Sequence, residues 1–281
     1  MIPAAFDYEV AESVDHAIAL LAEREDAKLL AGGHSLLPAM KLRVARPALL
    51  VDVGRLADLS YVRDGDGHIA IGALTRHKDV AAAALLREHC PIVSHTAGQV
   101  GDPQVRHRGT IGGSLAHGDP ASDLPTVILA LAGELVIRGS TGERTVPAST
   151  FFTGVFQTAV GPDEMLVEIR VPKLGPGTGW SYTKMSRRAQ DWATVAVAAV
   201  VERSNGSIGK ASIALTNMGA TPLRAKAAED AIAAGGLIDD ASTLASDGTE
   251  PSSDHAASAD FRRHLARVLA RRALEEAAAR S

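Results

Sequence analysis

The sequence predicts an α+β protein in two parts: mixed helices and strands over residues 1–174, and an antiparallel three-stranded sheet plus helices over residues 175–281. Three observations support this division. At about 150 residues per domain, a chain of 281 residues favours two domains. Residues 173–179, KLGPGTG, have the glycine and proline content of a linker. Three strand-like apolar runs follow that linker.

Residues 1–54 are expected to form a small β–loop–α–β unit. Ser13 is placed to cap a helix over residues 14–23, whose apolar side chains recur at helical spacing. Residues 28–30 form a short strand that leads into AGGHS, and a helix over residues 36–44 follows. The apolar run at residues 48–53 completes the unit as a buried strand.

Residues 55–174 are expected to form a second subdomain. Gly65-Asp66-Gly67 predicts a hairpin turn between strands at residues 61–64 and 68–71. Thr75 is expected to cap one alanine-rich helix over residues 75–88. Residues 101–123 show little regular pattern, and so long a loop is usually functional. The other predicted elements are helices at residues 91–100 and 124–131, and strands at residues 134–137, 143–146 and 165–171.

The three strands after the linker are expected at residues 180–185, 193–201 and 208–215. Asn205-Gly206 is a hairpin dipeptide and predicts the turn between the last two strands. The remaining elements are helices at residues 225–233 and 261–279, separated by a polar loop over residues 239–257.

Composition excludes several classes of protein. The formal net charge of −4 disfavours nucleic-acid binding, which needs excess Lys and Arg. One cysteine, Cys90, forms no internal disulfide and no all-cysteine iron–sulfur site, and fits a reducing compartment. The first fifteen residues lack the pattern of a secretory signal, and the longest apolar run, residues 192–201, is too short to cross a bilayer. We therefore expect a cytoplasmic protein without membrane insertion.

Two glycine pairs flanked by hydroxyl residues are the first candidates for function: AGGHS at residues 31–35 and TIGGS at residues 110–114. Glycine lacks the Cβ that keeps a backbone away from a ligand, and helix N-termini favour phosphate. Two such loops favour one extended ligand, such as a diphosphate with a large attached group. The alternative is that both pairs merely turn tightly. Neither matches the dinucleotide fingerprint GxGxxG.

Two polar clusters offer other chemistry. His34, His117, Asp119 and Asp123 could ligate a metal, although Asp123 could instead cap a helix. The segment KMSRRAQDW, residues 184–192, is either a solvated charged turn or a contact surface, and its terminal Trp192 favours contact.

Taken together, AGGHS, QVRHRGTIGGSLAHGDPASDLP and KMSRRAQDWATVAVAA identify a family. The chain resembles the FAD-binding medium subunits of the molybdenum hydroxylases, the group of carbon monoxide dehydrogenase and xanthine dehydrogenase. PAAFDYEVAES near the start and PSSDHAASADFRRHLARVLARRAL near the end extend the resemblance over the whole chain. It implies an FAD-binding domain of vanillyl-alcohol-oxidase (PCMH) type over residues 1–174, with subdomains at about 1–54 and 55–174. Residues 175–281 would form the smaller CO dehydrogenase flavoprotein-type domain.

The resemblance also implies which residues contact FAD, bound non-covalently. These are Leu29, Leu30, Ala31, Gly32, Gly33, His34, Ser35, Leu36, Val100, Thr110, Ile111, Gly112, Gly113, Ser114, Asp123, Leu166 and Lys184. Trp192, preceded by Asp191, would lie near the flavin ring, and we hypothesise that it packs on the ring and limits access. No side chain is expected to be catalytic, because the flavin carries the chemistry.

The implied function is electron transfer within a larger oxidoreductase. An iron–sulfur small subunit and a molybdopterin large subunit would complete a heterotrimer that pairs into a dimer, and the flavin would pass electrons to quinone, NAD or oxygen. The alternatives are a stand-alone flavin oxidase, a metal-dependent hydrolase, and a scaffold subunit that has lost its cofactor. The substrate of the complex would be decided by the molybdenum subunit.

Overall fold

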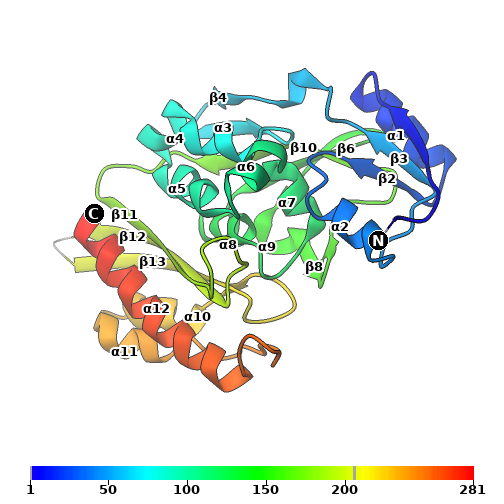
Figure 1. The fold of residues 1–281 in the computed structure, drawn as a ribbon. Helices are drawn as coiled ribbons and strands as arrows, with labels where there is room; N and C mark the ends of the chain where they lie inside the picture. The colour runs from blue at the N-terminus through cyan, green and yellow to red at the C-terminus, as the bar shows by residue number, and fades with distance from the viewer. Residues whose placement is uncertain (1, 205–206) are drawn as a thin grey trace.

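A computed structural model describes residues 2–204 and 207–281. Three main sheets follow one another along the chain: a small parallel sheet, a five-stranded antiparallel sheet and a four-stranded antiparallel sheet (Figure 1). A two-stranded hairpin forms a fourth, minor sheet. The protein therefore has the α+β fold expected from its sequence. No helix in the described residues is both long and apolar enough to cross a membrane.

The N-terminal unit is a parallel sheet in the order β1-β3-β2. Its elements are β1 (Asp7–Val10), α1 (Val14–Glu23), β2 (Ala27–Leu30), α2 (Leu36–Lys41) and β3 (Leu49–Asp52). Ser13 caps α1 as predicted, since its hydroxyl accepts from the His16 backbone N–H at 3.0 Å. β1 was not predicted, because most of its side chains are exposed and give no apolar signal. α2 is shorter than expected because Arg43 adopts positive φ.

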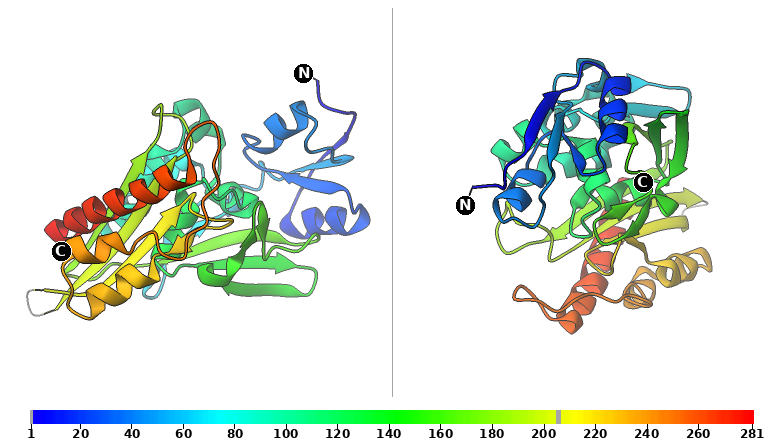
Figure 2. Two further views of the ribbon diagram at one scale, coloured as in Figure 1. Left: turned by 90° about the horizontal axis from the view of Figure 1, so that it is seen from below. Right: turned by 90° about the vertical axis from the view of Figure 1, so that its right-hand side faces the viewer.

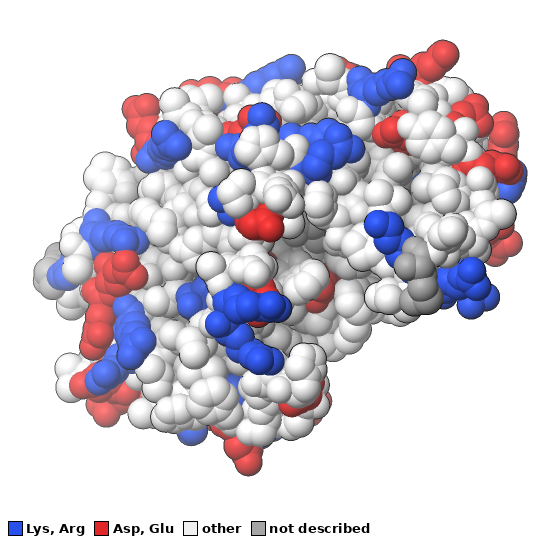
Figure 3. All heavy atoms as spheres, in the orientation of Figure 1, with Lys and Arg blue, Asp and Glu red and all other residues white. Residues whose placement is uncertain are grey.

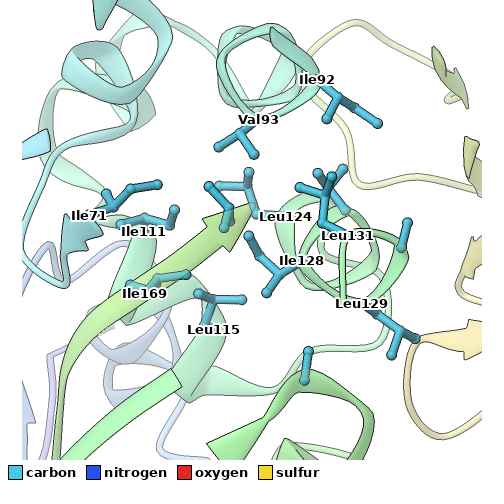
Figure 4. Close-up of a cluster of buried hydrophobic side chains, with 14 of the residues drawn as sticks. Ile71, Ile92, Val93, Ile111, Leu115, Leu124, Ile128, Leu129, Leu131 and Ile169 are labelled. Atoms are coloured by element: carbon cyan, nitrogen blue, oxygen red, sulfur yellow. The ribbon is translucent and has the colours of Figure 1, made fainter. Parts of the chain in front are cut away.

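The central sheet has the strand order β4-β5-β10-β6-β7, so the last of its strands in sequence lies in the middle. Its strands are β4 (Val62–Asp64), β5 (His68–Gly72), β6 (Glu134–Gly139), β7 (Gly142–Pro147) and β10 (Met165–Pro172). The helices and small hairpin around it are η1 (Ala57–Leu59), α5 (Pro91–Gln99), α8 (Asp123–Ala130), α9 (Ala148–Phe151), β8 (Phe152–Gly154) and β9 (Gln157–Thr158). Figure 4 shows part of the apolar core, in which Val93 of α5 and Ile128 of α8 lie near Ile169 of β10.

The predicted helix at residues 75–88 is wrong in two respects. It is two helices, α3 (His77–Ala82) and α4 (Ala84–His89), separated at Ala83, whose backbone is extended. The break has a tertiary cause: Arg87 Nε and Ser94 Oγ both donate to the Ala81 carbonyl, at 3.1 and 3.0 Å. Thr75 is not the cap, because its hydroxyl donates to the Gly72 carbonyl at 2.7 Å.

The segment at residues 101–123 is more regular than predicted. It contains α6 (Pro103–Arg108) and α7 (Ile111–His117). Asp102 caps α6 by accepting from the Val105 N–H at 2.8 Å, and Thr110 caps α7 by accepting from the Gly113 N–H at 3.1 Å. These short helices depend on caps and tertiary packing, and the two glycines of α7 conceal any helical pattern there.

The C-terminal sheet has four strands in sequence order: β11 (Thr178–Met185), β12 (Val195–Ser204), β13 (Ser207–Thr216) and β14 (Leu223–Arg224). The three long strands confirm the predicted antiparallel sheet. The two-residue β14 was missed because it is too short to show alternation. The predicted turn at Asn205-Gly206 lies outside the described residues.

Three helices accompany this sheet: α10 (Lys226–Ala233), α11 (Ile238–Thr243) and α12 (Ala259–Arg280). α11 contradicts the loop predicted over residues 239–257. It was missed because a helix of six residues gives little periodic signal. Figure 2 shows α12 lying along the sheet. Along β12, Val195, Val197 and Ala199 belong to the core beneath α12, whereas Ala196 and Ala198 face the core of residues 55–174. Both faces of β12 are therefore buried, which explains its continuous apolar sequence.

Candidate cofactor-binding site

A cavity of about 930 Å³ lies between the N-terminal unit, the central sheet and the β11–β12 connection. Figure 3 shows the hollow in this face of the molecule, with basic side chains gathered on either side. Its size is that of a site for a large cofactor.

The cavity collects residues that are far apart in the sequence. It is lined by all the predicted contacts except one: Leu29, Leu30, Ala31, Gly32, Gly33, His34, Ser35, Leu36, Val100, Thr110, Gly112, Gly113, Ser114, Asp123, Leu166 and Lys184, together with Asp191 and Trp192. The exception is Ile111, whose side chain is fully buried in the core. The two glycine-rich loops thus face one space, as the extended-ligand interpretation predicts.

The glycines act differently from the sequence-based expectation. A Cβ on Gly32 would lie 2.7 Å from the Cα of Gly109, so Gly32 allows the two loops to touch. A Cβ on Gly112 would lie 2.5 Å from the Ala73 Cβ and 2.6 Å from its carbonyl oxygen. At these two positions, glycine permits close packing of protein on protein. The cavity is the result of that packing.

A buried ion pair closes the cavity on the side of the C-terminal sheet. Lys184 Nζ lies 2.9 Å from Asp123 Oδ2, and the two side chains are only 6% and 7% exposed. Burial raises the pKa of Asp123, and the positive charge of Lys184 opposes that rise. Asp123 begins α8 and Lys184 lies on β11, so the pair joins the two parts of the chain.

Tyr182 completes this group and was missed in the sequence. Its hydroxyl donates to Asp123 Oδ1 at 2.6 Å, and burial raises its pKa well above the ordinary value. Tyr182 and Lys184 are two residues apart on β11 and so share one face of the strand. The alternation could have indicated that Tyr182 points the same way as Lys184. It could not have identified their shared partner, Asp123, which is about sixty residues away in the chain.

Trp192 lies at the mouth of the cavity with 63% of its surface exposed. The chain just after it is held firmly: the Asn217 side-chain amide donates to the Ala193 carbonyl at 2.9 Å, and the buried Arg262 donates to the Thr194 carbonyl. Asp191, before it, pairs with Arg188 at 3.1 Å. The tryptophan is thus free to contact a ligand while its backbone is anchored.

The residues considered as metal ligands do not assemble. The Asp123 carboxylate is occupied by Lys184 and Tyr182, and the ring of His117 packs against Phe156 with centroids 5.0 Å apart. Within residues 2–204 and 207–281, no group of three or more His, Cys, Asp or Glu side chains could hold a metal ion. The arrangement gives no support to the metal-dependent hydrolase.

His77, at the start of α3, also lines the cavity and was missed because its contacts come from distant residues. It is 3% exposed, and its backbone N–H donates to the Gly109 carbonyl at 3.0 Å. Burial, together with smaller contributions from Arg106 and His34, lowers the pKa of His77 to about 4. The imidazole is therefore neutral near pH 7.

This lowered pKa predicts a pH-dependent stability in the FAD-free protein. Between pH 6.5 and 4, the unfolded histidine binds a proton that buried His77 does not, so acid favours unfolding. We expect His77 to account for a loss of about 2 kcal/mol in the free energy of unfolding between pH 7 and pH 4.5. Urea unfolding at both values should show a smaller loss for His77→Gln. Equal losses in the variant and the wild type would contradict the prediction.

Both parts of the chain match known protein families. Residues 4–174 match the family described as the FAD binding domain in molybdopterin dehydrogenase, and residues 180–277 match the CO dehydrogenase flavoprotein C-terminal domain. The fold and the cavity thus define a flavin-binding subunit of an oxidoreductase. The chain belongs to the family of FAD-binding subunits of molybdopterin dehydrogenases.

The following relatives match this chain over nearly their full length. The carbon monoxide dehydrogenase medium chain of Hydrogenophaga pseudoflava is 41% identical, with 100% of this chain and 99% of the relative covered. Subunit alpha of the 6-hydroxypseudooxynicotine dehydrogenase complex of Paenarthrobacter nicotinovorans is 39% identical, with coverage of 99% and 96%. A structure of reconstituted CO dehydrogenase from Oligotropha carboxidovorans contains a chain that superimposes with a TM-score of 0.97 at 40% identity, and both chains are fully covered. Relatives that are about equally similar to this chain, at 41% and 39% identity, therefore belong to dehydrogenases that are named for different substrates.

Proposed function

We propose that the chain holds FAD in this cavity and relays electrons from the iron–sulfur clusters of a partner subunit to an external acceptor. The observation that carries the proposal is the single cavity shared by both glycine-rich loops and the buried Lys184. When bound, FAD supplies the chemistry that joins one-electron and two-electron transfer. The fit is supported by the cavity volume and by the polar side chains of His34, Ser35, Ser114 and Lys184 among the residues that line it.

Within the proposal, residues 29–36 and 110–114 hold the diphosphate and ribityl part of the cofactor. Val100 and Leu166 supply apolar contacts. Lys184, fixed by Asp123, places a positive charge that favours the reduced, anionic flavin. The domain limits, residues 1–174 and 175–281, are part of the same proposal, and the cavity lies where they meet.

Trp192 is proposed to pack on the flavin ring and restrict access to it. Trp192→Ala should therefore speed the reaction of the dithionite-reduced protein with oxygen several-fold, as measured by stopped-flow absorbance. Trp180→Phe is the matched control, since Trp180 lies beneath Arg280 and outside the cavity. An unchanged rate in Trp192→Ala would contradict the role.

The proposed partners are an iron–sulfur small subunit and a molybdopterin large subunit, in a heterotrimer that pairs into a dimer. The chain itself cannot supply a cluster: its single cysteine, Cys90, is buried, and burial raises the pKa of its thiol to about 12. Because electron transfer needs a short path, we expect the iron–sulfur subunit to cover the exposed rings of Phe156 and Trp192 at the mouth. A cytoplasmic location belongs to the proposal and is supported by the lone cysteine.

Purification of the tagged chain from its own host tests this assignment. We expect two further subunits to copurify, with molybdenum and iron in the complex, and the flavin to bleach when the complex turns over its substrate. A chain that purifies alone and oxidises a small molecule with its own flavin would establish the stand-alone oxidase instead. In that event FAD binding would stand, and the partner assignment would fall.

A further inference from the structure

We propose that Asn217 is a positioning residue of the flavin site: its side-chain amide holds Trp192 in the place from which the indole covers the ring of the bound cofactor. Asn217 directly follows β13 and does not itself line the cavity. The inference rests on the proposed function, because it takes Trp192 to pack on FAD.

The first observation is the loop that carries the tryptophan. Residues 186–194 connect β11 to β12, and the Thr194 N–H donates to the Met185 carbonyl at 2.8 Å, which closes the base of the loop. Trp192 lies near the end of this loop, with its ring largely exposed at the mouth of the cavity. A ring that is so exposed takes its place from the backbone that carries it.

The second observation is the set of hydrogen bonds that fixes this backbone. Asn217 Nδ2 donates to the Ala193 carbonyl at 2.9 Å and to the Thr194 carbonyl at 3.3 Å. These are the first two residues after Trp192, and both are buried. Arg262 of α12, itself 1% exposed, also donates to the Thr194 carbonyl. Asn217 is therefore the side chain that holds the carbonyl nearest to the tryptophan, and Arg262 supports the next one.

The third observation is the backbone of Asn217, which reaches a second side of the cavity. Its φ of 62° lies in the left-handed region, which asparagine tolerates better than most residues with a side chain. In this conformation its N–H donates to the Pro120 carbonyl at 2.8 Å, in the segment that leads into Asp123. One residue thus ties the Trp192 loop to the segment before the buried ion pair, and both Trp192 and Asp123 line the cavity.

Asn217→Gly isolates the role of the amide. Glycine adopts positive φ without strain, so the backbone and its bond to Pro120 can remain while the two bonds to the loop are lost. In the full chain with FAD, we expect the dithionite-reduced variant to react with oxygen several-fold faster than the wild type, because Trp192 no longer stays over the ring. A wild-type rate would overturn the proposal.

A double variant separates positioning from a general loss of stability. A residue that acts through Trp192 has no effect once the indole is gone, so Trp192→Ala/Asn217→Gly should react no faster than Trp192→Ala alone. Equal acceleration by Asn217→Gly in both backgrounds would overturn the proposal. Ser212→Ala is the control: it removes another buried hydrogen bond, to the Ala130 carbonyl, between two residues outside the cavity lining. Its oxygen reaction should match that of the wild type.

A spectroscopic readout follows the tryptophan itself. The sequence has two tryptophans, so Trp180→Phe leaves Trp192 as the sole reporter. In this background and without FAD, Asn217→Gly should lower the fluorescence anisotropy of Trp192, because the indole moves more freely. At saturating FAD, the flavin should quench Trp192 emission less in Asn217→Gly than with Asn217 intact. Unchanged anisotropy and unchanged quenching would overturn the proposal. If the protein with Asn217 intact binds no FAD, the proposed function falls, and the anisotropy of the FAD-free protein still decides whether Asn217 holds Trp192.

Discussion

Replacement of Asp123 by leucine is expected to lower the free energy of unfolding by about 3–5 kcal/mol, because it strands the Lys184 ammonium without a counter-charge. The two side chains are almost fully buried and 2.9 Å apart, so water cannot replace the lost carboxylate. Tyr182 would lose its acceptor at the same time. Urea unfolding monitored by circular dichroism measures the effect.

The double variant Asp123→Leu/Lys184→Met supplies the control. Replacing both charges by apolar groups is often close to neutral, so we expect most of the lost stability to return. FAD affinity should be reduced in the double variant, because the positive charge of Lys184 is then missing. If Asp123→Leu costs less than 1 kcal/mol, or if the second change restores nothing, the buried pair is not the stabilising contact described here.

Gly112→Ala is expected to cost about 3 kcal/mol of stability and to abolish retention of FAD. The added Cβ would meet the backbone of Ala73, whose carbonyl oxygen already accepts from the Gly112 N–H at 2.8 Å. No flexible side chain can move aside, so the start of α7 must shift away from Ala73 and the cavity lining must change. Unfolding curves and the flavin content after desalting measure the two effects.

Gly98→Ala is the matched control for that experiment. Gly98 lies in α5, and a Cβ there would come no closer than 4.0 Å to the Ala81 Cβ. Alanine favours a helix interior over glycine by up to about 1 kcal/mol, so this variant should be unchanged or slightly more stable. If Gly112→Ala behaves like Gly98→Ala, the close packing at α7 does not shape the site.

Sequence patterns predicted much of the fold, because caps, turns and strands are determined largely by residues that are close together in the chain. The Ser13 cap, the Gly65-Asp66-Gly67 hairpin and the three long strands of the C-terminal sheet all follow from sequence neighbours. The break at Ala83 could not be predicted, since it depends on the Arg87 and Ser94 side chains both donating to the Ala81 carbonyl.

Some residues of the candidate site could be predicted from the sequence, and others could be found only in the folded structure. The glycine pairs are visible as motifs, and they do line one cavity. Tyr182 and His77 carry no motif, because each matters through a residue that only the folded chain brings near: Asp123 for the tyrosine and Gly109 for the histidine. The reason for Gly32 was also invisible in the sequence, since the residue it packs against, Gly109, is far away in the chain and directly precedes the second loop.

The visible absorption spectrum of the purified chain, taken after addition of FAD and desalting, tests the central claim most directly. We expect flavin bands that survive desalting, bleach with dithionite and fall in Gly112→Ala. A colourless protein that retains no FAD, while its unfolding curve shows an intact fold, would contradict the claim that this cavity holds the cofactor.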